Sequence, residues 1–243
     1  MAVQCSTGGT YLSSYPANNM PNTNTAITLM GWVNYSGWNT VATASMLGLY
    51  NGTATSSTTP TTAIQLGART VAGQLYAWTW GGGTLVNTTA GSPTLTNGTW
   101  YHIAYTCTAL ATTQTHILYI NGVQSAQATN STQVSGALTQ MYINGYPQIS
   151  GGTRESSAVI VDSCAAYNRA LSATEIQTIY NCRGIRHGIT FGLIAQYLFS
   201  ESSSGNISNC ADYSVSKSLM TSGAGTALTY TGGTVFQNTR PQL

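Results

Sequence analysis

The chain has 243 residues, a net charge of +2 and only 5% charged residues, against about 25% in ordinary globular proteins. Low charge can accompany disorder, but 42% of the residues are hydrophobic and 15 are tyrosine, which is ample material for a core. The basic residues are scattered, which argues against nucleic-acid binding, and no stretch approaches the ~20 apolar residues of a membrane span. The length allows one large all-β domain or two small ones, with a surface rich in hydroxyl and amide groups.

Alternating apolar residues predict the first strands at 6–15 and 26–35, with a loop rich in Asn and Pro between them. The second segment places Trp32 on the opposite face from Leu29 and Val33. We expect the indole of Trp32 to pack in the core.

Three further strands are expected between loops rich in Thr, Ser and Gly, at 44–50, 63–69 and 74–80. In the last of them Tyr76, Trp78 and Trp80 share one face beside a Gly-Gly-Gly turn. The flat rings could stack on the apolar faces of a sugar, form a subunit interface, or belong to the core. The sequence leaves these three alternatives open.

A hairpin is predicted from GTWYHIAYTC at 98–107 and THILYINGVQ at 115–124. Its turn contains Asn121–Gly122, and both residues accept the positive φ of a type I′ turn. His102 has no acid or nucleophile beside it in the sequence, so we expect a structural histidine. Another strand is expected at 138–144.

The segment VIVDSCAAY, residues 159–167, alternates and is rich in β-branched residues, which predicts a strand. Val161 and Ser163 are expected on one face, with Asp162 and Cys164 on the other. We expect Asp162 to fix the turn that follows the strand.

One short helix is predicted at 172–181. Ser172 followed three residues later by Glu175 fits a capping box, in which each side chain satisfies a backbone N–H at the helix start. The apolar residues that follow recur at helical spacing: Ile176, Ile179 and Tyr180.

These segments resemble the signatures of concanavalin A-like, laminin-G-like jelly-roll domains. YNRALSATEI, from Tyr167 to Ile176, is similar to the family's "YNRALsaaEI". The predicted hairpin is similar to "gtWhHvAvtyd…lrlYvNGvlv", and 26–35 is similar to "fTisaWvk". The resemblance implies a two-sheet β-sandwich, a jelly roll with one short α-helix.

The segment 192–233 resembles the family's first motif, yet it comes last here. One explanation is a circular permutation of a single domain, 1–243, whose final strands close against residues 6–15. The alternative is a domain at 1–184 followed by a partial second unit at 185–243. We favour permutation because about fifty residues supply few strands for a second domain.

The acidic residues give little support for enzyme activity. Glycosidases need two carboxyl groups about 5–9.5 Å apart, and no two of the five acids here lie within four residues of each other. We expect no enzyme activity, with glycoside hydrolysis as a distant alternative. These acids are Glu155, Asp162, Glu175, Glu201 and Asp212.

Calcium is the one cofactor that the resemblance implies, because laminin-G-like and pentraxin-like relatives bind it at the sheet rim. Asp212 matches the family's "DsSG" and is the best single candidate ligand, although one carboxylate makes a weak site and an Asx-turn that closes a loop is the favoured explanation. The odd number of cysteines leaves at least one unpaired within the chain, and we expect reduced thiols. They are Cys5, Cys107, Cys164, Cys182 and Cys210.

A structural or binding module follows from these observations. The low charge, and the lack of a secretory signal after Met1, favour a phage virion surface protein: a capsid decoration, knob or fibre-associated subunit. Its partners would be other virion proteins or copies of itself, as a homo-oligomer and by first guess a trimer. Contacts are expected at the aromatic face and at loop 51–62. The alternative is a carbohydrate-binding lectin domain of a secreted or cell-surface protein.

Overall fold

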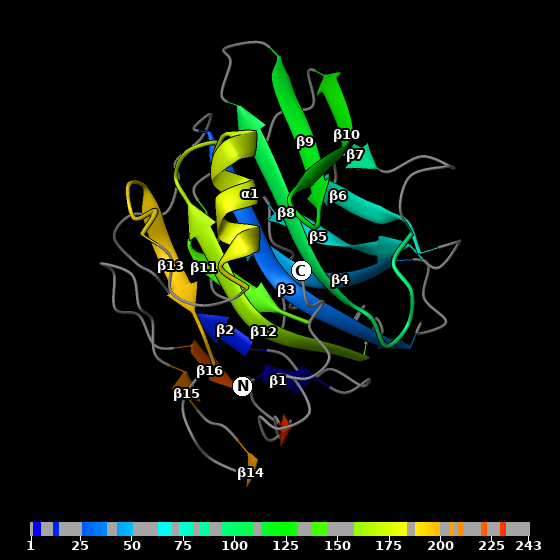
Figure 1. Cartoon of the computed structure of the whole chain (residues 1–243), viewed down its shortest axis with the longest axis vertical. Helices are drawn as coiled ribbons and strands as arrows, with labels where there is room; N and C mark the ends of the chain where they lie inside the picture. The colour runs from blue at the N-terminus through cyan, green and yellow to red at the C-terminus, as the bar shows by residue number, and fades with distance from the viewer. Residues whose placement is uncertain are drawn as a thin grey trace, which may run out of the picture.

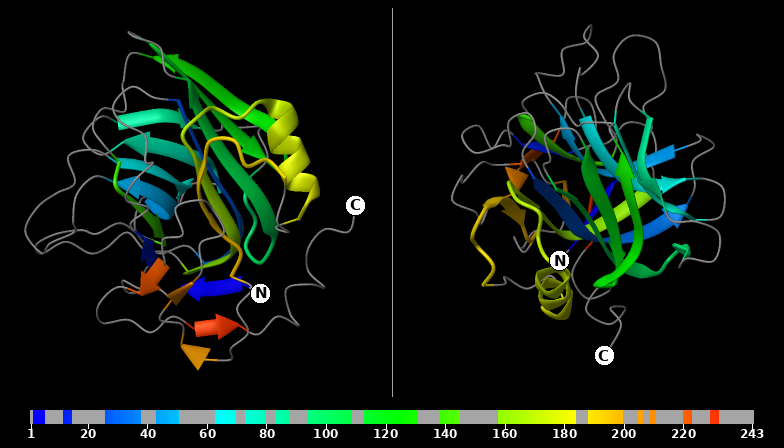
Figure 2. Two further views of the ribbon diagram at one scale, coloured as in Figure 1. Left: turned by 90° about the vertical axis from the view of Figure 1, so that its left-hand side faces the viewer. Right: turned by 90° about the horizontal axis from the view of Figure 1, so that it is seen from above.

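The structure, a computed structural model, describes residues 2–5, 12–14, 26–37, 43–50, 63–69, 73–79, 83–87, 94–108, 113–130, 138–144, 158–183, 188–199, 205–206, 209–210, 220–222 and 229–231. These residues form two antiparallel β-sheets packed face to face, with one helix on the outer face of the larger sheet (Figures 1 and 2). The predicted all-β sandwich with one short helix is confirmed.

The larger sheet, called sheet A here, has nine strands. In spatial order they are β10 (Val123–Asn130), β9 (Gln114–Ile120), β8 (Trp100–Thr108), β3 (Ile27–Gly37), β12 (Ala158–Tyr167), β1 (Ala2–Cys5), β17 (Thr229–Thr231) and β14 (Gly205–Asn206). The ninth strand, β13 (Leu193–Tyr197), pairs with the last residues of β12, whereas β1 pairs with its first residues.

The second sheet, sheet B, has eight strands. In spatial order they are β15 (Asn209–Cys210), β16 (Met220–Ser222), β2 (Leu12–Ser14), β11 (Gln140–Ile143), β4 (Thr43–Tyr50), β5 (Ala63–Arg69), β6 (Leu75–Thr79) and β7 (Gly83–Asn87).

The core lies between the two sheets because successive side chains of a strand point to opposite faces. In β3, Leu29 and Val33 join the core between the sheets, whereas Met30 and Trp32 pack in separate clusters with residues of the helix. The predicted division of this strand and the buried position of Trp32 are therefore confirmed.

A β-bulge interrupts β12. Val161 lies opposite Val33 and Cys164 lies opposite Gly31, so three steps along β12 match two steps along β3. The extra residue reverses the alternation, which is the usual effect of a bulge. Cys164 therefore joins Val161 in the inner core, and the prediction that they lie on opposite faces is wrong.

Asp162 was expected at the turn after the strand, and this prediction is wrong. Asp162 lies inside β12 at the bulge and is buried. The turn is held by Thr28 of β3, whose hydroxyl donates to the Arg169 carbonyl at 2.8 Å and accepts from the Leu171 N–H at 2.9 Å. A long-range contact therefore does what we assigned to a local side chain.

Strands from the two ends of the sequence pair in both sheets. Val3 of β1 lies opposite Tyr230 of β17, and Ser13 of β2 lies opposite Thr221 of β16. Figure 1 places these strands together at one end of the molecule. A single permuted domain requires such pairing, and circular permutation remains our interpretation of it.

The single helix, α1 (Ala173–Asn181), begins where the capping motif predicts. Ser172 accepts from the Glu175 N–H, while the Glu175 carboxylate accepts from the Ser172 N–H at 2.9 Å, so the capping box is complete. The apolar side chains expected on one face are buried: Ile176, Ile179 and Tyr180. Through this face α1 packs on the outer side of sheet A (Figure 2).

Candidate functional site

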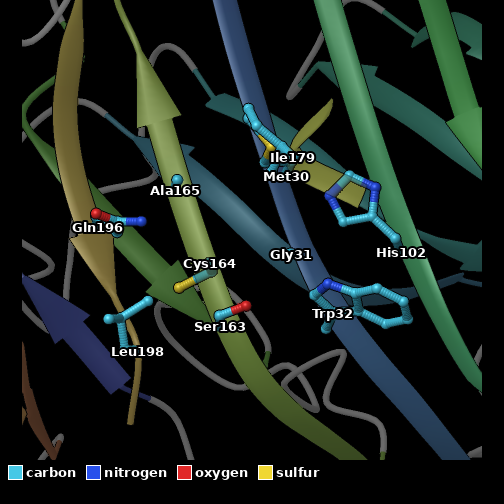
Figure 3. Close-up of a pocket in the computed structure, with 10 residues that line it drawn as sticks. All are labelled: Met30, Gly31, Trp32, His102, Ser163, Cys164, Ala165, Ile179, Gln196 and Leu198. Carbon is cyan, nitrogen blue, oxygen red and sulfur yellow. The ribbon is translucent and has the colours of Figure 1, made fainter. Parts of the chain in front are cut away.

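A pocket opens between α1 and the outer side of sheet A, over β3, β12 and β13 (Figure 3). It is bounded mainly by buried side chains that come from five elements of the fold and from the segment after β13. The lining residues are Met30, Gly31, Trp32, His102, Ser163, Cys164, Ala165, Ile179, Gln196 and Leu198.

The bulge of β12 explains how a polar side chain reaches this pocket. Regular alternation predicts that Ser163 shares the face of Val161, and in the structure that face is the inner core. The extra residue instead brings Ser163 and Ala165 to the pocket, while Cys164 belongs to the inner core cluster and also borders the pocket. A local irregularity of one strand therefore creates one wall of the site.

Aromatic rings form a second wall. Trp32 and Tyr180 stack with centroids 5.5 Å apart and an interplanar angle of 20°. The His102 ring lies 5.6 Å from Trp32 and 6.0 Å from Tyr180, tilted against both. His102 is thus held between rings of β3 and α1, as a structural histidine would be, and it also faces the pocket.

The size of the pocket limits what can enter. The space open to the centre of a water molecule is about 20 Å³, little more than one water requires. Among the described lining residues, the polar side chains of Ser163, His102 and Gln196 face a mainly apolar remainder. Such a pocket can hold one small group with an apolar and a polar part, but it cannot enclose a pyranose ring.

Two of the three predicted aromatic contact residues lie in β6. Tyr76 and Trp78 alternate with core residues of that strand, which puts their rings on the outer side of sheet B. Their ring centroids are 5.7 Å apart. The exposed fraction is 6% for Tyr76 and 9% for Trp78, so little ring surface remains for a ligand or a neighbouring subunit. Trp80 and loop 51–62 lie outside the described residues.

The described ranges contain two carboxylate side chains. Glu175 is bound by Arg169, and Asp162 is buried in the bulge. Within the same ranges, no group of three His, Cys, Asp or Glu side chains could hold a metal ion. The proposed calcium ligand Asp212 lies outside them, as do Glu155 and Glu201.

Three cysteines fall in the described ranges with their side chains. Cys107 and Cys164 are buried, as expected, and Cys182 is partly exposed at the end of α1. Burial raises the pKa of the Cys107 thiol from 9.0 to about 11. The helix that the described residues contain is too short and too polar to cross a membrane.

Residues 6–177 match the family model of the concanavalin A-like lectin/glucanases superfamily. The chain belongs to this superfamily. No curated protein matches it.

Solved structures share the fold at low sequence identity. A candidate carbohydrate-binding protein from Bacteroides ovatus is 14% identical, with a TM-score of 0.62 over 95% of this chain and 60% of that one. The heptameric pentraxin of Limulus polyphemus is 14% identical, with a TM-score of 0.55 over 94% of each chain. A Trypanosoma rangeli sialidase is 19% identical, with a TM-score of 0.50 over 67% of this chain and 23% of that one.

These similarities establish the fold and no more, because all the identities are low. The chain spans 60% of the length of the Bacteroides protein. The superfamily member described here therefore has the sandwich architecture of these proteins, and its ligand must be argued from its own residues.

The sequence analysis missed two polar side chains of the pocket, those of Ser163 and Gln196, although both left a trace in the sequence. Gln196 is a polar residue inside the apolar run LIAQYLF, and it is buried in β13. Asp162 and Ser163 are consecutive polar residues inside an apolar strand, a pattern that can accompany a bulge. Neither trace indicates by itself that the two side chains line one pocket.

Proposed function

We propose that this chain is a non-catalytic carbohydrate-binding module that acts outside the cell. The observation that supports the proposal is membership of a superfamily of lectins and glucanases, matched over residues 6–177. The Bacteroides protein with the same fold, itself a candidate carbohydrate-binding protein, supports it further.

Binding is favoured over hydrolysis by the state of the described carboxylates. Glycosidases need one carboxyl group to donate a proton and a second to act as base or nucleophile. Here the Glu175 carboxylate is occupied by Arg169 and by the capping box, and Asp162 is buried inside β12. Neither is placed to serve in such a pair.

The composition suggests that the ligands are uncharged glycans. Only 5% of the residues are charged, so long-range electrostatic attraction contributes little. Recognition would rest on hydrogen bonds from Asn, Gln, Ser and Thr and on aromatic contacts with the sugar rings.

A glycan array tests the proposal directly. The purified protein is applied at micromolar concentration, with calcium and with a chelator. We expect binding to a related group of glycans above background, confirmed in solution by calorimetry. The absence of binding to every glycan in both conditions would contradict the proposed function. A loss of binding with chelator alone would support the calcium site suggested for Asp212.

A second candidate is a subunit of a larger assembly, such as the surface of a phage virion. The observation in its favour is again the low charge, because few charges leave little repulsion between copies. Mass spectrometry of purified particles, with sedimentation analysis of the isolated protein, tests this candidate. A monomer at all concentrations that is absent from particles would contradict it.

A further inference from the structure

We propose that the pocket beside α1 binds the acetamido group of an N-acetylated sugar. The inference rests on the proposed carbohydrate-binding function and names the class of sugar that the module would select. It concerns the substituent that enters the pocket, while the sugar ring stays outside.

The pocket is small. It has room for about one water-sized group, which is close to the size of the methyl end of a substituent. Nine of the ten lining residues are buried, and Leu198 alone among them is partly exposed, so the pocket is largely closed. Only a substituent that projects from a sugar ring can enter it.

The lining is divided into an apolar and a polar part. Met30, Trp32 and Ile179 offer an apolar surface to a methyl group. Gln196 and Ser163 offer an amide and a hydroxyl, and they are only 3% and 8% exposed. Figure 3 shows the Gln196 amide on one side and the rings of Trp32 and His102 on the other, with Ser163 between them.

Other common substituents of sugars fit this lining less well. A carboxylate would lose its hydration without gaining a cation, because the described lining contains no Lys or Arg. A hydroxyl or hydroxymethyl group could bond to the polar part but would leave the apolar wall without a methyl contact. An acetamido group matches both parts, since its methyl is apolar and its C=O and N–H can each form a hydrogen bond.

The test compares sugars that differ only in this group. Chitotriose and cellotriose share their linkage and differ by the acetamido group at C2, and arrayed glycans ending in N-acetylgalactosamine or galactose provide a second pair. Removing the methyl contact and the paired amide should weaken binding at least about tenfold. We therefore expect a preference of that size for the acetylated member of a pair.

Variants then locate the preference in the pocket. Ser163→Ala and Gln196→Met remove the two polar groups with little change in volume, and each should lose most of the preference. Gln124→Met, on the exposed part of β10, is the matched control and should keep it. Saturation-transfer NMR should show the acetyl methyl as the most strongly saturated ligand proton in the native protein, and less so in both pocket variants. Melting temperatures identify any variant that fails to fold, and Ser163→Ala is the smaller change should Gln196→Met do so.

Each outcome is decisive. Equal binding of acetylated and non-acetylated glycans overturns the inference and leaves the proposed function standing. A preference that persists in both folded pocket variants shows that another site is responsible. Binding of no glycan at all overturns the proposed function and this inference with it.

Discussion

Arg169 holds both carboxylate oxygens of Glu175, with Nη1 at 3.0 Å from Oε2 and Nη2 at 2.6 Å from Oε1. Such a bidentate pair fixes direction as well as distance. The Nε of Arg169 also donates to the Phe191 carbonyl at 2.7 Å, and its guanidinium lies 5.4 Å from the Phe191 ring centroid. One arginine thus joins the end of β12, the start of α1 and the segment before β13.

This pair makes stability depend on pH in acid. Hydrogen bonding to Arg169 lowers the pKa of Glu175 from 4.5 to about 2 in the folded protein. A lowered pKa means that the folded state favours the ionised form, so its contribution is fully present above about pH 4.5. The contribution is lost as the pH falls from 4.5 toward 2. Thermal unfolding followed across this window should show a declining melting temperature.

The Glu175→Gln variant isolates this effect from the other carboxylates. It should be less stable than the native protein at pH 7, and the difference between the two should shrink as the pH approaches 2. A difference that stays constant from pH 7 to pH 2 would contradict the assigned role of the Arg169–Glu175 pair.

Ser172→Ala should destabilise the protein by about 0.5–2 kcal/mol, because it removes the side chain that accepts from the Glu175 N–H at 3.3 Å. For a domain of this size, a loss of 1 kcal/mol lowers the melting temperature by about 2–4 °C. Ser172→Asp preserves an accepting cap and serves as the control. If both variants melt like the native protein, the cap contributes nothing to stability.

Thr28→Val should cost about 1–3 kcal/mol, although the two side chains have almost the same shape. The Thr28 hydroxyl satisfies two backbone groups of the turn, the Arg169 carbonyl and the Leu171 N–H. Valine would leave both without this partner in a buried place. Chemical denaturation measures the loss, and Thr28→Ser, which keeps the hydroxyl, should recover most of it. An unaffected Thr28→Val variant would show that the turn is held by other contacts.

The rate of alkylation should differ between the cysteines according to their burial. Cys107 is buried and its pKa is raised to about 11, so at pH 8 its thiolate is scarce. Cys182, partly exposed after α1, should react with iodoacetamide at least about 100-fold faster in the folded protein. Peptide mapping assigns the label to each cysteine, and denaturant should abolish the difference. Equal rates in the folded state would mean that the core around Cys107 opens readily.

The features that the sequence predicted well are local ones. The capping box, the helical spacing after it and the Asn121–Gly122 turn depend on residues a few positions apart, and all three lie where expected, with φ of 51° and 78° at the turn. The bulge of β12 depends instead on its fit to β3, more than a hundred residues earlier. The pocket follows from that bulge and from the approach of β13, so only the three-dimensional arrangement reveals it.

Tyr76 and Trp78 show a second limit of prediction from the sequence alone. Alternation predicted correctly that the two rings share one side of β6, yet it could not tell how much of them stays exposed. Exposure depends on what packs over a strand from elsewhere in the chain. A pattern within one strand therefore identifies a face without identifying its function.

The pairing of β1 with β17 and of β2 with β16 has a consequence for synthesis on the ribosome. Residues 2–5 are synthesised before both of their partner strands, which lie at 158–167 and 229–231. At about 5–20 residues per second, the second partner follows some 10–45 s later. During that interval the edge of β1 that β17 later covers has no partner strand. Neither sheet is complete until residues 220–222 and 229–231 have been synthesised.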